Sequence, residues 1–233
     1  MTAGAEPMLN GKRLADASGF DLALPQSVVL VFDEGLVPRS RLRSLKSTDP
    51  RPFRSVAAID AGVAVVAAMG PGAPVAAVTV ELLAALGVRQ IVSVGTAGRL
   101  SASGQDPSLH LAERAVSDEG TSVHYGATLV PDHGLLDLLH SLTGASKSVT
   151  LTTDVPFRHT ADRLAQHRNQ AELVEMEVAA IYAAAHHHRV AAASLLVISD
   201  EFGTSDWEPI AGPEVTAMLS TAVQTACQAL SQR

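Results

Sequence analysis

Apolar runs alternate along the chain with stretches in which apolar residues recur at helical spacing. Runs of about four to eight apolar residues bounded by Gly, Pro or polar residues are typical of strands, and longer runs with a period of about 3.6 residues are typical of helices. Strands are therefore predicted at residues 28–32, 55–59, 63–69, 90–94, 147–151 and 191–199. Helices are predicted at residues 74–86, 132–142, 161–169, 173–182 and 212–230.

The alternation of strands with helices predicts an α/β fold. Strands joined through helices form a mostly parallel sheet that is covered on both faces. We therefore expect a single three-layer domain with a central mixed, mostly parallel sheet flanked by helices. The chain contains no internal repeat or linker, so this domain is expected over residues 21–233. Residues 1–20, rich in Gly, Ala, Ser and Asp, are expected to form a flexible leader.

Two carboxylates interrupt apolar segments of the pattern. On the helical period, Leu173, Glu177 and Ile181 share one face of the predicted helix over residues 173–182. A buried carboxylate is costly unless it is paired or hydrogen-bonded, and a ligand can supply the donors. Asp200 follows the apolar strand over residues 191–199. Together the two acids indicate a site for a polar, neutral or basic small molecule.

The predicted position of this site follows from the topology of α/β sheets. In such sheets ligands bind beyond the carboxyl ends of the strands. Three segments that are rich in glycine or polar residues fall there, namely residues 69–72, 95–98 and 199–200. We expect these segments to meet around one pocket.

Composition and charge exclude several classes of partner. The 233 residues carry a formal net charge of −7, whereas nucleic acids and anionic membranes both require a basic face. The single cysteine, Cys227, excludes an internal disulfide and fits a reducing compartment. No apolar run reaches the roughly 18 residues of a membrane span, and the N-terminus lacks the apolar core of a signal peptide. We expect a cytoplasmic protein with no nucleic-acid or membrane partner.

Four sequence blocks, in matching order and spacing, carry a resemblance to a known family. They are residues 69–74 (MGPGAP), 93–98 (SVGTAG), 174–177 (VEME) and 198–200 (ISD). The chain resembles the nucleoside phosphorylase-I family over roughly residues 28–230. This family comprises the purine and uridine phosphorylases and the nucleosidases that act on methylthioadenosine and adenosylhomocysteine. The resemblance implies a nucleoside phosphorylase-like domain that binds a nucleoside, most simply a purine nucleoside.

The resemblance implies a role for each acid in cleaving an N-glycosidic bond. Glu177 resembles the carboxylate that accepts hydrogen bonds from the ribose hydroxyls, where it would stabilise positive charge developing on the sugar. Met176 resembles the methionine that packs on the sugar. Asp200 resembles the general acid that protonates the departing base. The implied base-binding residues are Ala97, Gly98, Phe157 and Asp200, with Phe157 as an aromatic stacking wall.

The chain departs from the family pattern where the phosphorylases bind phosphate. Ser93 stands where the phosphorylases usually carry an arginine, whose planar fork suits phosphate. The first phosphate loop is matched only in part, by residues 35–39, which lose the family's Asp. The implied phosphate-binding residues are Gly35, Arg39 and Thr96.

These departures leave three functions open. The favoured one is a nucleoside phosphorylase that transfers ribose to phosphate. The alternatives are a nucleosidase that uses water, with Glu34 as the nearest candidate to activate it, and a non-catalytic nucleoside- or base-binding accessory protein. Family members are oligomers, so we expect a homo-oligomer with sites near subunit interfaces, where Arg51 or Arg54 would reach a neighbouring site.

No metal or organic cofactor is implied, and phosphate would be a co-substrate. His186, His187 and His188 cannot chelate one ion from a helix, because consecutive helical side chains point about 100° apart. Glu175 lies on the other side of the predicted helix from Glu177. We therefore expect Glu175 to have a structural role, pairing with Arg158 or Arg163.

Overall fold

The structure is a computed structural model, and it describes residues 7–17, 22–38, 42–43, 53–59, 62–101, 107–126, 128–203, 206–210 and 212–233. The helices are α1 Gly11–Ala17, α2 Ala73–Ala85, α3 His133–Thr143, α4 Ala161–His167, α5 Val178–His188 and α6 Pro213–Ser231. Short 3-10 turns are η1 Glu34–Leu36, η3 Ser122–His124 and η4 Pro156–Arg158. The strands are β1 Ser27–Val31, β2 Leu42–Arg43, β3 Ser55–Ile59, β4 Val63–Ala67, β5 Gln90–Arg99, β6 Leu109–Asp118, β7 Ser146–Thr153, β8 Leu173–Glu175, β9 Ala191–Phe202 and β10 Trp207–Pro209.

The strands form one mixed sheet in the order β10-β9-β6-β7-β8-β5-β1-β4-β3-β2, with a further pairing between β9 and β5. The central strands β4, β1, β5 and β9 are parallel to their neighbours in that series. The β3–β4 hairpin and β10 add antiparallel pairs. Because β5 also pairs with β9 and β8, the strands β5, β9, β6, β7 and β8 close into a ring.

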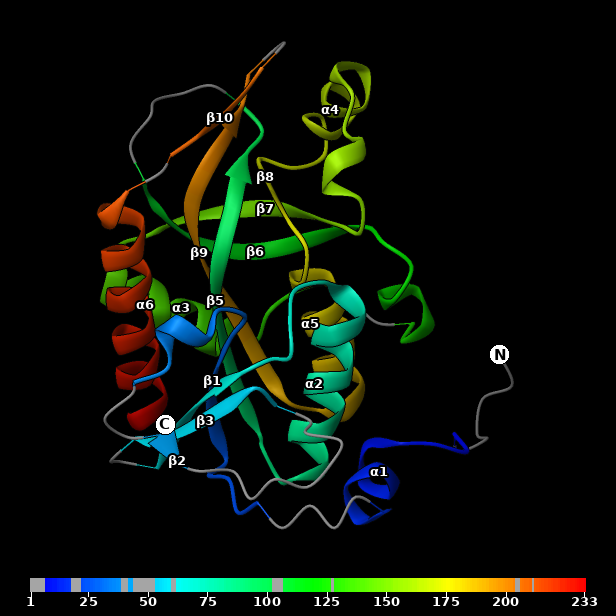
Figure 1. Cartoon of the computed structure of the whole chain (residues 1–233), viewed down its shortest axis with the longest axis vertical. Helices are drawn as coiled ribbons and strands as arrows, with labels where there is room; N and C mark the ends of the chain where they lie inside the picture. Colours follow the sequence, from blue (N-terminus) through cyan, green and yellow to red (C-terminus); the bar gives the residue numbers. More distant parts are fainter. Residues whose placement is uncertain are drawn as a thin grey trace.

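Helices cover both faces of the sheet, as Figure 1 shows. Helices α2 and α5 lie on one side with α1 beside α2, and α3 and α6 lie on the other. Strand β1 explains why its sequence is a continuous apolar run. Val28 and Leu30 pack into one helix layer while Val29 and Val31 pack into the other, because successive strand residues point to opposite faces. The predicted three-layer α/β domain is confirmed.

The predicted elements are present, with two differences at the expected site. Residues 95–98 do not form a turn after a strand; they continue β5, and the register with β9 shifts between Ala97 and Gly98 because β9 bulges there. Residues 173–182 do not form one helix. Leu173–Glu175 is strand β8, and α5 begins only at Val178. Strands β6 and β10 lie outside the ranges predicted from the sequence.

The segment expected to be a leader contains helix α1. Its Gly11 lies so close to α2 that a Cβ atom would be 2.4 Å from the carbonyl oxygen of Glu81, and Ala15 is buried. Residues 1–6 and 18–20 lie outside the described part of the chain. Among the described helices, none is long and apolar enough to cross a membrane.

Candidate functional site

One cavity of about 250 Å³ opens at the carboxyl ends of the parallel strands. Residues at the ends of β1, β5, β7 and β9 line it, together with the corner between β8 and α5 and the loop before α2. The lining residues are Phe32, Pro71, Gly95, Thr96, Ala97, Gly98, Thr153, Pro156, His159, Val174, Glu175, Met176, Glu177, Ser199, Asp200 and Phe202. The three segments expected to meet therefore do so.

The structure brings six of the residues predicted for the site around this cavity. They are Thr96, Ala97, Gly98, Met176, Glu177 and Asp200. Phe157 does not line it. Its side chain is 97% exposed, and its neighbours Pro156 and His159 line the cavity instead. Gly35 lies in η1 and is not among the lining residues, and Arg39 lies outside the described residues.

Glu177 sits at the corner where β8 turns into α5. Its Oε1 accepts a hydrogen bond of 2.6 Å from the backbone N–H of Gly72, in the loop before α2. Gly72 has φ of 106°, a conformation that favours glycine. Burial raises the pKa of Glu177 above its usual value. The carboxylate is thus held by the backbone of one element while it lines the cavity.

Glu175 holds this corner in place from inside. Its Oε2 accepts hydrogen bonds of 2.6 and 2.7 Å from the N–H groups of Glu177 and Val178, and its Oε1 accepts one from the Thr152 hydroxyl. Burial, followed by the nearby Glu177 carboxylate, raises the pKa of Glu175. It therefore has the expected structural role, but through backbone N–H groups rather than an arginine.

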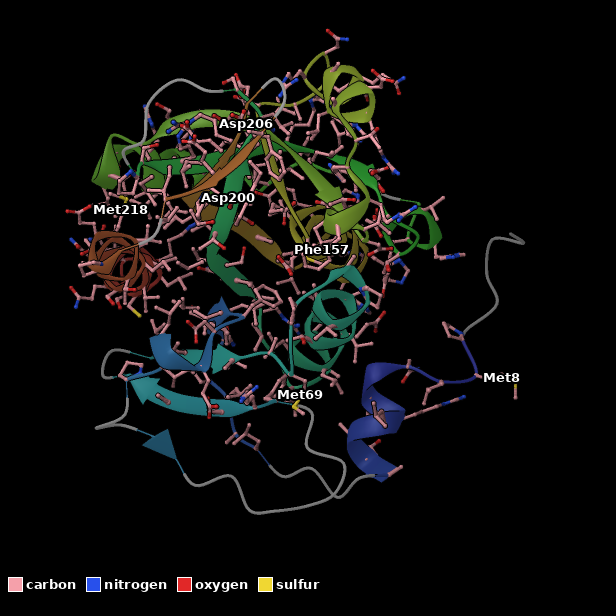
Figure 2. All side chains as sticks on the ribbon, turned by 45° about the horizontal axis from the view of Figure 1, so that its top comes forward. Met8, Met69, Phe157, Asp200, Asp206 and Met218 are labelled. Carbon is pink, nitrogen blue, oxygen red and sulfur yellow. The ribbon has the colours of Figure 1, made fainter. Side chains whose placement is uncertain are left out.

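Asp200 lies near the end of β9, where β9 bulges against β5 (Figure 2). Its Oδ1 accepts a hydrogen bond of 2.7 Å from the Ser199 hydroxyl, and its Oδ2 accepts one of 2.9 Å from the indole N–H of Trp207. A Cβ atom at Gly98 would be 2.7 Å from Asp200 Oδ2 and 2.7 Å from the Phe202 ring. Glycine at position 98 therefore leaves room for the carboxylate.

A second polar group, which the sequence analysis missed, adjoins the cavity through Thr153 and His159. The Thr153 hydroxyl lies 3.2 Å from Asp118 Oδ2 and 3.2 Å from His159 Nε2. Burial lowers the pKa of His159 and of His167, whose rings lie 5.3 Å apart, and so favours their neutral forms. Only the folded structure reveals this group, because Asp118 and His159 are far apart in the sequence.

This group has some of the geometry of a cation site. Ligand atoms of Asp118, His159 and His167 lie within 4.8 Å of one another. Arg163 already provides the positive charge: its Nη2 donates to both Asp118 oxygens, at 2.7 and 2.8 Å, and its Nε donates to His167 at 3.3 Å. The group is therefore an arginine–carboxylate pair buttressed by two imidazoles. This arginine pairs with Asp118 and not, as expected, with Glu175.

The cavity itself is acidic. Glu175, Glu177 and Asp200 line it, and among the lining residues that the structure describes none is Lys or Arg. Ser93, at the position of the family's phosphate clamp, is buried and donates a hydrogen bond of 2.7 Å to Ser194 on the neighbouring strand. Arg54 is paired with Glu34 at 2.7 Å, and Arg51 lies outside the described residues. The described residues around the cavity thus suit a neutral or basic ligand better than an anion.

Comparison with known proteins identifies the family. A sequence model of the phosphorylase superfamily matches residues 46–232. A guanosine phosphorylase from Halorubrum lacusprofundi is 32% identical over 125 residues, which make up 50% of this chain and 52% of that protein. A DeoD-type purine nucleoside phosphorylase from Streptococcus uberis is 28% identical over 153 residues, 58% of this chain and 62% of that protein. The aligned part thus spans about half to three fifths of these relatives.

Solved structures share the whole fold at low sequence identity. A purine nucleoside phosphorylase from Toxoplasma gondii in complex with immucillin-H has a TM-score of 0.74 and 17% identity, and the match covers 100% of this chain and 99% of that one. An AMP nucleosidase from Bacteroides thetaiotaomicron has a TM-score of 0.76 and 17% identity, over 95% and 94% of the two chains. Because the family match extends over well over half of the chain, this protein belongs to the phosphorylase superfamily, and the resemblance to the nucleoside phosphorylase-I family is confirmed.

Proposed function

We propose that the protein is a purine nucleoside phosphorylase, which cleaves the N-glycosidic bond and transfers ribose to phosphate. The observation that carries this proposal is that Glu177 and Asp200, from different elements, line the same cavity. Cleavage of such a bond needs help at the sugar and at the departing base, and a binding site alone does not need the second acid. Two of the relatives, a guanosine phosphorylase and a purine nucleoside phosphorylase, carry names of this activity.

The surroundings of the two acids support different roles in this reaction. Glu177 is fixed by a backbone N–H group, so its negative charge is preorganised beside a sugar that gains positive charge. We assign it, with Met176, to the ribose. Asp200 shares its end of the cavity with Gly98 and Phe202. We assign it to the base, as the acid that transfers a proton to the leaving group and so contributes about 10²–10⁴-fold in rate.

The residues around the cavity indicate the acceptor of the ribose less directly than they indicate the sugar and the base. Thr96 lines the cavity and is assigned to phosphate together with Gly35 and Arg39. Hydrolysis is the second candidate, because the described lining residues include neither Lys nor Arg to neutralise an anion. A non-catalytic nucleoside-binding protein is the third candidate, although such a protein would not need the acid Asp200.

A turnover assay separates the three candidates. The purified protein is mixed with a panel of purine and pyrimidine nucleosides, with and without phosphate, and release of the free base is measured. Release that requires phosphate supports the phosphorylase, and release without phosphate would establish a nucleosidase. Binding without release would leave only the accessory role. Arg39→Ala should raise the KM for phosphate, whereas Arg13→Ala, on α1 outside the cavity, should not.

We also propose that the active form is a homo-oligomer with its sites near subunit interfaces, and that it acts in the cytoplasm without a metal or organic cofactor. Exposed apolar side chains beside the cavity-lining residues support the oligomer. Phe157 follows Pro156, and Met69 precedes the loop that contains Pro71. Large exposed apolar groups close to a functional site are typical of surfaces that a partner covers.

A further inference from the structure

The chain has a single tryptophan, and it contacts Asp200. Trp207 opens strand β10 and pairs with Phe202 of β9. Its indole Nε1–H donates to Asp200 Oδ2 at 2.9 Å, although its side chain is 56% exposed and does not line the cavity. A large aromatic ring in such an exposed position buries little area, so packing alone does not account for this contact.

The turn end of the β9–β10 hairpin is held by hydrogen bonds that do not involve the indole. The N–H of Gly203 donates to the carbonyl of Asp206 at 2.8 Å, which closes the turn. Arg168, which follows α4, donates to the carbonyls of Leu100, Phe202 and Gly203. An arginine with several carbonyl partners is held in one orientation. Arg168 therefore fixes the hairpin, and the hairpin in turn places Trp207 next to Asp200.

The two donors at Asp200 together define the direction of its carboxylate. The Ser199 hydroxyl binds Oδ1 and the Trp207 indole binds Oδ2, so one donor lies on each oxygen. The close approach to Gly98 limits the carboxylate on another side. A general acid is effective only when it is held within hydrogen-bonding geometry of the atom that receives its proton.

We propose that Trp207 is a positioning residue, whose indole N–H holds the Asp200 carboxylate toward the base-binding end of the cavity. The inference rests on the proposed function in assigning a base to that end. The contact between the indole and the carboxylate does not depend on that assignment.

The first test measures this contact without any substrate. Because Trp207 is the only tryptophan, emission excited at wavelengths that tyrosine does not absorb reports on its surroundings alone. Replacing the carboxylate by Asp200→Ala should shift the emission maximum of the ligand-free protein, whereas Asp206→Asn in the same hairpin should leave it in place. An unchanged emission maximum in Asp200→Ala would overturn the proposal, whether or not the protein turns over a nucleoside.

The second test measures the consequence for catalysis. Trp207→Phe keeps an aromatic ring but removes the donor, and it should lower kcat about 10-fold or more, the worth of one hydrogen bond to a charged group. The KM for the nucleoside should change much less, because the contact is made by the acid and not by the substrate. Ser199→Ala removes the other donor and should act in the same direction.

The outcomes separate the two proposals. A Trp207→Phe variant with kcat within about 2-fold of the wild type, under conditions where Asp200→Asn is inactive, overturns the positioning role. A wild type that releases no base from any nucleoside overturns the proposed function instead. In that case the emission maximum of Asp200→Ala still shows whether the Trp207 indole contacts the Asp200 carboxylate. Circular dichroism and urea unfolding of Trp207→Phe check that a loss of kcat does not come from misfolding.

Discussion

At the scale of single residues, the two acids of the cavity differ in what surrounds them. Glu177 accepts a hydrogen bond from a backbone N–H and lies half-buried beside Glu175, while Asp200 accepts hydrogen bonds from two side-chain donors and lies over a glycine. Environments that differ in this way let two carboxyl groups take different parts in one reaction. The side chains that support each acid are therefore as informative as the acids themselves.

The role of Asp200 leads to a prediction about its isosteric variant. Asp200→Asn keeps the size of the side chain and an oxygen that can accept from Trp207 or Ser199, but it cannot act as an acid. Turnover of purine nucleosides should fall about 10²–10⁴-fold, with a much smaller change in their dissociation constant. Steady-state kinetics and equilibrium binding measure the two effects, with Asp206→Asn as the matched control. An unchanged kcat would remove Asp200 from the mechanism.

At the residue scale, the residues that the sequence motifs pointed to line the cavity, whereas the residue chosen from a loop does not. Glu177, Met176 and Asp200 line the cavity as expected. At the turn η4, the sequence pointed to Phe157 as the aromatic wall, whereas Pro156 and His159 line the cavity. A short 3-10 turn presents successive side chains in different directions, and the sequence does not show which of them faces inward.

At the scale of elements, the segment over residues 173–182 illustrates why periodicity misled. Leu173 and Val174 fit an apolar helical stripe, yet they pair as a strand with β5 and β7. Short apolar runs fit both structures, and only long-range pairing decides between them. The same holds for residues 95–98, because pairing with β9 keeps these glycine-rich residues in a strand. A local pattern can indicate each of these strands, but it does not show which strands pair.

The corner between β8 and α5 leads to a prediction about pH. The pKa of Glu175 is raised, so the folded state binds its proton more tightly than the unfolded state. The stability from this group is fully present below the usual glutamate pKa and is lost as the pH rises through the raised value. The contribution of Glu175 to the free energy of unfolding should fall from about pH 5 to about pH 9, by roughly 1.4 kcal/mol for each unit by which the pKa is raised.

Urea unfolding at a series of pH values measures this fall. In Glu175→Gln the fall should be smaller, because the contribution of Glu175 is removed while that of Glu177, whose pKa is also raised, remains. The same change at Glu113, an exposed glutamate of β6, should preserve the whole fall. A pH profile of Glu175→Gln that matches the wild type would show that this carboxyl group does not titrate with folding.

At the scale of the whole molecule, the sequence predicted the layers but not the ring. The order of strands and helices was sufficient for a sheet covered on both faces, as Val28 to Val31 show. The closed ring depends on β6 and on the second pairing of β9, which join residues distant in the chain. Likewise, the group of Asp118, His159 and Arg163 exists only once the ring and α4 are assembled.

The exposed apolar side chains lead to a prediction about assembly. The wild type should be a homo-oligomer in size-exclusion chromatography with light scattering at micromolar concentration. Phe157→Asp places a charge beside the cavity and should shift the protein toward the monomer, because a buried unpaired charge opposes association. Met8→Asp makes the same kind of change at another exposed apolar residue, which Figure 2 shows well away from Phe157, and it should not alter the assembly. A monomeric wild type would contradict the expected assembly.

The cavity is built from the far ends of strands whose near ends lie in the hydrophobic core. In β5, for example, Ile91 to Val94 are packed between the helix layers, and Thr96 to Gly98 line the cavity. A chain that has lost its core therefore cannot retain the pocket, and ligands bind the native state alone. By mass action, a ligand at 100 times its dissociation constant should add about 2.7 kcal/mol to global stability. A thermal-shift screen of candidate ligands would thus register binding before any product is known.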